Sequence, residues 1–486
     1  MNKTDSYSKT GLFAKYKHTP FFCELLTRLA SGDSQLQRLF NKLDTMNGAA
    51  LATRSRDMHQ ELYQQGITFA VYSENESTDR VLPVDIIPRA ITAQEWHILE
   101  AGILQRARAL NMFLHDIYHE QRILKDGVIP QNLVLNNSYY RKEMQGIDVP
   151  GGVYVHICGI DLIRDEDGIF KVLEDNARIP SGVSYVINNR RIMLRLFPDI
   201  MSLVDVQSVE EYGQNLRIAL SEVKPKNAQD PRIVLLSPGM YNSAYFEHVF
   251  LAQEMGVPLV EGGDLIVKDD VVYMRTTSGL ERVDVIYRRV DDNFLDSEVF
   301  YRGSTLGVSG IMRAYRKGNV TIANAIGTGV ADDKAVYAYM PRAIQYYLGE
   351  EAILPNVKTF ICAERESLQY TLDNLHELVV KPVGESGGYG MIIGPTATTK
   401  ELQDFRKKLL ADPANYISQP VMKLSVSPTL IDEGIEPRHV DFRPFVVTGA
   451  KSWVLPGGLT RVALKRGSLI VNSSQGGGSK DTWVLR

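Results

Sequence analysis

The chain has 486 residues, a hydrophobic content of 44% and a charged content of 23%, which suit a soluble globular protein of roughly two or three domains. Its formal net charge of −4 gives no electrostatic reason to expect binding to nucleic acid or to an anionic membrane. Three isolated cysteines exclude a disulfide framework, and neither an apolar leader nor an apolar run of about 18 residues occurs, so we expect a cytoplasmic protein.

The N-terminal region is predicted to be mainly helical. Residues 1–65 have a helical pattern, and residues 68–72 favour a strand. Thr92 and Glu95 then form a capping-box signature, and apolar residues follow at helical spacing as far as Ile117. This pattern predicts a long amphipathic helix whose apolar stripe packs in the core.

Acidic and amide side chains gather on a predicted hairpin at residues 160–176. An acidic turn between its two strands would bring Asp161 near Glu174, and Glu174 and Asn176 share one strand face. Carboxylate and carboxamide oxygens are ligands that Mg²⁺ accepts when it also binds phosphates. An acidic turn in solvent is the alternative interpretation.

A polar break at residues 225–230 is a candidate linker, and a strand–helix–strand unit begins at Arg232. The loop SPGMYN after the first strand lacks the glycine spacing of a dinucleotide site, so we interpret it as structural or substrate-facing. A later strand, within residues 284–292, ends in two arginines that could grip an anion or form surface salt bridges.

The segment Val379–Met391, VVKPVGESGGYGM, joins a β-branched strand to a glycine-rich loop. Lys381 would project a fixed cation from the strand end, and the glycines would let backbone N–H groups approach an anion. The segment therefore predicts either a nucleotide site or a glycine-rich hairpin with a surface lysine.

Residues 441–474 form a third segment of interest. Two apolar strands flank a predicted tight turn at Thr448-Gly449, and Arg443 and Arg461 place guanidinium groups near the strand ends. Arginine forks suit phosphate oxygens. An ordinary basic hairpin is the alternative.

Together, the three segments resemble the ATP-grasp carboxylate–amine ligases. In that family a Val-Lys-Pro strand and a glycine loop hold ATP, a strand pair opening on Asp-x-Arg follows, and an Asp and a Glu-x-Asn hold Mg²⁺. Here the Asp and Glu-x-Asn precede Lys381 instead of following Asn472. The chain thus resembles a circularly permuted ATP-grasp protein, similar to glutathionylspermidine synthetase but without that enzyme's amidase domain.

The resemblance implies an α/β (α+β) fold: a circularly permuted ATP-grasp fold with an inserted Rossmann-like domain of the kind called pre-ATP-grasp. Residues 1–225 would hold the N-terminal helices and the metal-binding part, residues 226–330 the Rossmann-like domain, and residues 331–486 the ATP-binding part.

The resemblance also implies ATP and Mg²⁺ as cofactors and a ligase reaction through an acyl phosphate. Arg461 would stabilise the transferring phosphoryl group, and Arg443 would be the arginine of Asp-x-Arg. The remaining implied site residues fall into four groups: Asp161, Glu174 and Asn176 for metal; Lys334, Lys381 and Gln419 for the nucleotide; Gly387, Gly388 and Gly390 for a lid; and Ser181 and Ser184 for the acyl substrate.

Several alternatives stay open. Ser181 and Ser184 could instead cap the next helix. Gln419 stands where the family usually has a glutamate, so an ATP-binding protein without ligase turnover is a second hypothesis. An NAD oxidoreductase built on residues 232–330 would lack the G-x-G-x-x-G pattern, and a serine hydrolase would lack G-x-S-x-G. The substrates would be a small-molecule or peptide carboxylate and an amine, but no motif encodes their identity.

Overall fold

The computed structural model describes residues 10–16, 19–30, 32–72, 77–384, 390–432, 434–465, 468, 471 and 477–486, with the backbone alone for residues 69–72 and 77–79. Its central sheet has the strand order β20-β19-β4-β5. These strands are β4 (Ile157–Arg164), β5 (Phe170–Asn176), β19 (Phe445–Thr448) and β20 (Ser452–Val454).

The central sheet joins the two halves of the chain. β4 pairs antiparallel with β5, which sets Asp161 opposite Glu174, and it pairs antiparallel with β19 on its other side. The predicted acidic hairpin and the turn after Thr448 are thus confirmed. Because β19 follows β4 by nearly 300 residues in the chain, the arrangement fits the permuted order of the segments.

The N-terminal elements agree with the sequence prediction. Helices α2 (Ser34–Asp44) and α3 (Gly48–Gln64) precede β1 (Thr68–Tyr72), and the capping box of Thr92 and Glu95 starts α4 (Ala93–Tyr118). The apolar stripe of α4 is buried in a core shared with β4 and β19. The apolar stripe of this helix therefore supports the central sheet.

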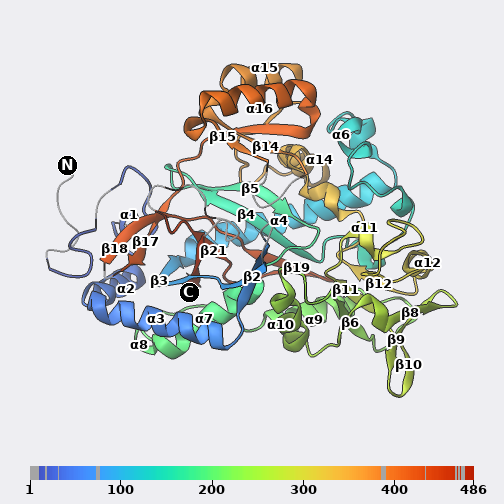
Figure 1. The fold of residues 1–486 in the computed structure, drawn as a ribbon, viewed down its shortest axis with the longest axis horizontal. Coiled ribbons are helices and arrows are strands. Elements are labelled where there is room, and N and C mark those ends of the chain that lie inside the picture. The colour runs from blue at the N-terminus through green and yellow to red at the C-terminus, as the bar shows by residue number, and fades with distance from the viewer. Residues whose placement is uncertain are drawn as a thin grey trace.

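A second sheet ties the C-terminal end of the chain to its N-terminal half. β22 (Gly478–Val484) lies between β21 (Thr460–Val462), its antiparallel partner, and β3 (Val84–Ile91), its parallel partner. In Figure 1 the C-terminus accordingly lies among these strands near the middle of the molecule.

The region of the predicted nucleotide strand forms a separate layer at the top of Figure 1. Its antiparallel sheet has the order β13-β16-β14-β15, and its helices are α15 (Arg365–Asp373) and α16 (Thr399–Ala411). The strands are β13 (Phe360–Ile361), β14 (Leu378–Pro382), β15 (Ile392–Ile393) and β16 (Tyr416–Pro420).

A parallel sheet with the order β12-β11-β6-β7 forms the Rossmann-like unit at the lower right of Figure 1. It contains β6 (Ile233–Leu236), β7 (Leu259–Val260), β11 (Val285–Arg288) and β12 (Thr321–Ala323), with α9 (Tyr212–Glu222) and α10 (Tyr245–Met255) beside it. An antiparallel meander of β8 (Leu265–Lys268), β9 (Val271–Thr276) and β10 (Gly279–Arg282) is inserted after β7.

The two arginines at the end of β11 are buried, so the surface interpretation is wrong. Arg288 donates to the carbonyls of Asn324, Val290 and Ala325. Arg289 donates to the Pro180 carbonyl at 2.7 Å. Both side chains therefore hold loops together.

The remaining helices and strands complete the fold. They are α1 (Leu26–Leu29), α5 (Arg122–Lys125), α6 (Gln131–Leu135), α7 (Val183–Leu196), α8 (Pro198–Met201), α11 (Asp292–Leu295), α12 (Ile311–Arg316), α13 (Lys334–Ala338), α14 (Met340–Leu348), β2 (Ser77–Val81), β17 (Val426–Ile431) and β18 (Gly434–His439). Within the described ranges, no helix combines the length and apolar character needed to cross a bilayer.

Candidate active site

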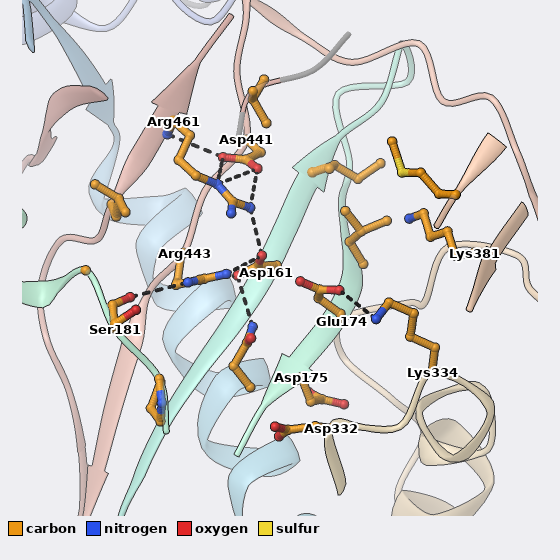
Figure 2. Close-up of a pocket in the computed structure, with 18 of the residues that line it drawn as sticks. Asp161, Glu174, Asp175, Ser181, Asp332, Lys334, Lys381, Asp441, Arg443 and Arg461 are labelled. Atoms are coloured by element: carbon orange, nitrogen blue, oxygen red, sulfur yellow. Dashed lines mark hydrogen bonds and ion pairs between the residues drawn. The ribbon is translucent and has the colours of Figure 1, made fainter. Parts of the chain in front are cut away.

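A cavity of about 610 Å³ lies where the central sheet, the sheet β13-β16-β14-β15 and the Rossmann-like unit meet, and Figure 2 shows part of its lining. Most of the predicted site residues line it. They are Asp161, Glu174, Asn176, Ser181, Lys334, Lys381, Gln419, Arg443 and Arg461. The structure thus brings together side chains from three segments far apart in the sequence.

The predicted metal ligands lie on the paired strands β4 and β5. Asp161 is buried, and the Asn176 carboxamide nitrogen donates to it at 3.3 Å. Because the nitrogen of the Asn176 carboxamide faces Asp161, its oxygen can accept from or coordinate another group. Glu174 keeps 24% of its side chain exposed, and its Oε2 lies 3.7 Å from the Lys334 Nζ.

Two arginines converge on Asp161. Arg443 Nη2 and Arg461 Nη2 each donate to it at 2.7 Å, and Arg443 Nε donates to its other oxygen. Burial alone would raise the pKa of Asp161, but the two guanidinium charges hold that pKa well below its usual range. Asp161 therefore stays ionised, and Glu174 is the more accessible carboxylate on this hairpin.

Arg461 is fixed by a further carboxylate. Its Nε donates to both oxygens of Asp441, at 3.0 and 2.9 Å. Burial would lower the pKa of Arg461, but Asp441 and Asp161 raise it above its usual range. Among the described residues no hydrogen bond is found for its Nη1, and the side chain lines the cavity.

The strand β4 makes room for Arg443 through a glycine. A Cβ at Gly159 would lie 3.2 Å from Arg443 Cδ, closer than side chains normally pack. This position therefore favours glycine because the arginine stem crosses the strand there.

The two lysines face the cavity from the opposite side to the arginines, as Figure 2 shows. Lys381 Nζ donates to Gln419 Oε1 at 2.9 Å, and Gln419 Nε2 donates to Thr359 Oγ1 at 2.9 Å. Burial lowers the pKa of Lys381 to about 8; Glu174 opposes this shift and Lys334 adds to it. An anion bound beside Lys381 would stabilise its protonated, positively charged form.

The donor set fits Mg²⁺ shared with phosphates. No three His, Cys, Asp or Glu side chains in the described ranges are grouped so that the protein alone could hold a metal ion. Mg²⁺ is commonly held by one or two carboxylates together with substrate phosphates. Glu174, the Asn176 carboxamide and Asp161 supply such an incomplete oxygen set beside two lysines.

The glycine loop is described only at its ends. Gly387 and Gly388, which were predicted to form a lid, lie outside the described residues. Gly390 has φ +68°, and a Cβ there would lie 3.1 Å from Pro382 Cγ, so this position favours glycine. The Tyr139 hydroxyl donates to the Gly384 carbonyl at 3.3 Å, which ties the near end of the loop to the body.

The two predicted substrate serines differ. Ser181 lines the cavity, and its carbonyl accepts from Arg443 Nη1 at 3.3 Å. Ser184 is fully buried and donates to Glu247 Oε2 at 2.8 Å. We therefore do not place Ser184 at the substrate, because a buried partner already takes its hydroxyl.

A charged group that was not predicted from the sequence also lines the cavity: Arg178, Asp291 and Asp332. Arg178 donates to Asp291 at 3.0 Å, and its Nε lies 3.3 Å from Asp332. Burial raises the pKa of Asp332 to about 6, against the lowering effect of Arg178. The only sequence signal was the position of Asp332, two residues before Lys334.

A protein-family model matches most of the chain. A family model described as circularly permuted ATP-grasp type 2 matches residues 88–463. The matched range contains every predicted site residue.

Two relatives are similar over nearly the whole chain. An uncharacterized protein of Synechocystis sp. is 50% identical over 467 residues, which are 96% of this chain and 97% of that protein. An uncharacterized protein of Mycobacterium tuberculosis is 51% identical over 448 residues, which are 92% of this chain and 81% of that protein.

Two further matches carry ligase-type names. A Frankia alni protein provisionally named glutamate–cysteine ligase 2-3 is 42% identical over 93% of this chain, which spans 52% of that protein. The solved structure of a glutathione synthetase-like effector from Globodera pallida matches with a TM-score of 0.57 and 12% identity, over 90% of this chain and 98% of that one. At this identity the match shows the fold alone.

Proposed function

The chain belongs to the circularly permuted ATP-grasp type 2 family, and from this premise we propose that it is an ATP-dependent carboxylate–amine ligase. It would form an amide or peptide bond through an acyl-phosphate intermediate. The observation that carries the proposal is the single cavity in which carboxylates of the N-terminal half face cations of the C-terminal half.

The nucleotide end of the cavity supplies cations for a polyphosphate. Lys381 and Lys334 would contact the ATP phosphates, and Gln419 would fix the Lys381 ammonium through their 2.9 Å hydrogen bond. Glu174 and Asn176, with Asp161 behind them, would hold Mg²⁺, which when bound neutralises phosphate charge and orients the transferring group.

The arginine pair would act on the reacting groups. Arg461 and Arg443 are held by Asp161 and Asp441, so their charges are fixed before any substrate binds. An oxygen of the substrate carboxylate would take the γ-phosphoryl group and ADP would leave. The amine nitrogen would then bond to the acyl carbon, the C–O bond to phosphate would break, and phosphate and a proton would be released.

The substrate end of the cavity faces the Rossmann-like unit. Ser181 and the Arg178–Asp332 pair line it, so we propose that the carboxylate and amine substrates enter there. The names of the ligase-type relatives support testing glutamate, cysteine and short peptides first. We also propose domain boundaries near residues 225 and 330.

A second candidate is an ATP-binding protein of the same fold without ligase turnover. The observation that favours it is Gln419, whose carboxamide is committed to Lys381 and Thr359. Because both the oxygen and the nitrogen of this carboxamide already have hydrogen-bond partners, Gln419 is less available to bind a nucleotide.

An isotope experiment tests the ligase proposal. The purified protein is incubated with MgATP and pairs of amino acids, peptides and polyamines, and phosphate release and product masses are measured. For an active pair, ¹⁸O in the substrate carboxylate should appear in the released phosphate, since the acyl phosphate passes one oxygen to it. Lys381→Met is the negative control.

The outcomes separate the two candidates. An amide product with ¹⁸O in the phosphate supports the ligase. ATP binding by calorimetry without phosphate release on any pair would favour the second candidate, and release of unlabelled phosphate with an amide product would refute the acyl-phosphate route.

A further inference from the structure

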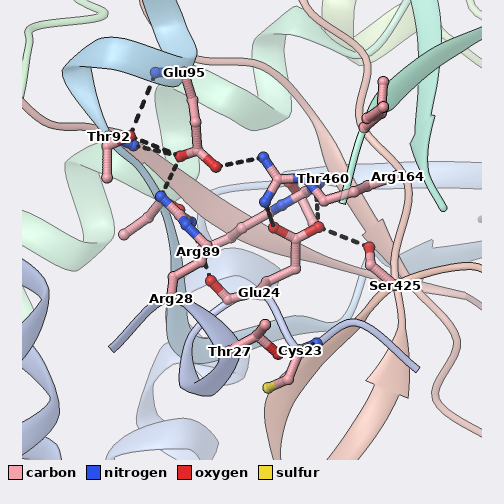
Figure 3. Close-up of polar contacts among 12 residues, drawn as sticks. Cys23, Glu24, Thr27, Arg28, Arg89, Thr92, Glu95, Arg164, Ser425 and Thr460 are labelled. Atoms are coloured by element: carbon pink, nitrogen blue, oxygen red, sulfur yellow. Dashed lines mark hydrogen bonds and ion pairs between the residues drawn. The ribbon is translucent and has the colours of Figure 1, made fainter. Parts of the chain in front are cut away.

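A buried network of charges joins the N-terminal segment to the backbone around Arg461 (Figure 3). Its centre is Glu24, just before α1, which is 2% exposed. Glu24 accepts from Arg89 at 2.6 Å, from Arg164 at 3.0 Å and from the Ser425 hydroxyl at 2.7 Å. Glu24 lies outside the range 88–463 that the family model matches, whereas its three partners lie within it.

The network reaches the candidate active site through Arg89. This side chain is 1% exposed, and its Nη1 donates to the Asp441 carbonyl at 2.8 Å and to Thr460 Oγ1 at 3.3 Å. Asp441 and Thr460 are the anchor and the chain neighbour of Arg461. The backbone that holds Arg461 is therefore fastened to Glu24 through one guanidinium group.

Glu24 and Glu95 share the charge of the buried arginines: Arg164 donates to both, at 3.0 and 2.6 Å, whereas Arg89 donates to Glu24. Arg89 Nε and Arg164 Nε have no hydrogen-bond partner among the described residues, so other contacts must hold these side chains. Burial would raise the pKa of Glu24, but Arg164, Arg89 and Arg28 lower it to about 2, so it stays charged at neutral pH. Removing one partner of a buried charge group leaves the others uncompensated, which displaces them or draws in water.

We propose that Glu24 is a positioning residue for Arg461, acting through Arg89 and the backbone of Asp441. The segment before the family-matched range would thus be part of the active site's support. The kinetic consequence rests on the proposed ligase function, whereas the structural link does not.

The kinetic test compares Glu24→Gln with a matched control. Asp85→Asn removes another buried carboxylate, which joins β3 to β22 through Lys480, and Asp85 does not line the cavity. We expect Glu24→Gln to lower kcat by about 10-fold or more with KM for ATP within about 2-fold, because misplaced Arg461 affects the transition state. Asp85→Asn should keep its kcat per folded molecule. Equal kcat losses in the two variants would overturn the proposal.

A second test does not depend on activity. Melting temperatures are measured for Glu24→Gln, Arg461→Gln and the double variant, and for the same cycle built on Asp85→Asn. Coupled residues give non-additive losses, so the Glu24 double variant should lose clearly less than the sum of its single variants, while the Asp85 cycle should add. Additive losses in the Glu24 cycle would overturn the link even if the enzyme is a ligase. If the protein turned over ATP with no substrate pair, the ligase function would be refuted. The melting-temperature cycle of Glu24→Gln and Arg461→Gln would then still test the link between Glu24 and Arg461.

A milder variant covers the case in which Glu24→Gln does not fold. Ser425→Ala removes one hydrogen bond to Glu24 and keeps every charge of the network. We expect a kcat loss of about 2- to 3-fold with KM for ATP unchanged. A folded Ser425→Ala protein with wild-type kcat and additive melting losses with Arg461→Gln would then overturn the proposal.

Discussion

Replacement of Glu174 by glutamine should separate stability from catalysis. Its carboxylate lies 3.7 Å from the Lys334 ammonium, which corresponds to a gross attraction of about 4 kcal/mol at an effective dielectric constant near 20. Both side chains are partly exposed to the cavity, at 24% and 11%, so screening leaves a net contribution of about 1 kcal/mol or less. The melting temperature should therefore fall by no more than about 2 to 4 °C.

The catalytic loss should be much larger. The negative charge of Glu174 is proposed to hold the metal as charge shifts on the γ-phosphoryl group, and removal of one preorganised electrostatic group costs about 2.7–4 kcal/mol of barrier. The turnover number should thus fall about 100- to 1,000-fold, whereas ATP affinity should change by less than about 3-fold.

The assay is single-turnover phosphate release at saturating MgATP, with the ATP dissociation constant measured on the same sample. Asp165→Asn is the matched control, since Asp165 lies on the same hairpin, pairs with Lys171 at 2.9 Å and does not line the cavity. A Glu174→Gln protein that lost ATP affinity and kept its turnover number would refute the assigned role.

Three further predictions follow from the same cavity. Arg461→Lys keeps one charge but cannot reproduce the fork on Asp441, so single-turnover cleavage should fall at least about 10-fold; a lowered melting temperature with normal cleavage would make Arg461 structural only. ATP affinity should weaken as pH rises through about 8, because Lys381 loses its proton there, and calorimetry across pH 7 to 9 should find no such dependence in Lys381→Met. Gly159→Ala should displace Arg443 and cost about 1–3 kcal/mol of overpacking, with kcat reduced more than the melting temperature suggests; unchanged kinetics would show that the strand absorbs the methyl group.

The local patterns of the sequence determined much of the fold. The capping box at Thr92 begins α4, and the acidic turn closes the β4–β5 hairpin. Short-range periodicity and turn chemistry encode such elements, because their hydrogen bonds join residues close in the chain. The three segments that resemble ATP-grasp ligases were recognisable for the same reason, and the family match confirms that resemblance.

The tertiary structure alone decided the partners of the charged side chains. It shows that Asp161 accepts from two arginines some 300 residues away in the chain, that Ser184 is buried on Glu247, and that the arginines at the end of β11 hold loops. Nothing in the segment around Glu24 marks it as the centre of a buried network, because a single carboxylate in a short turn usually faces solvent. Whether a charge is buried and paired depends on which distant strands pack against it, and that is a property of the whole fold.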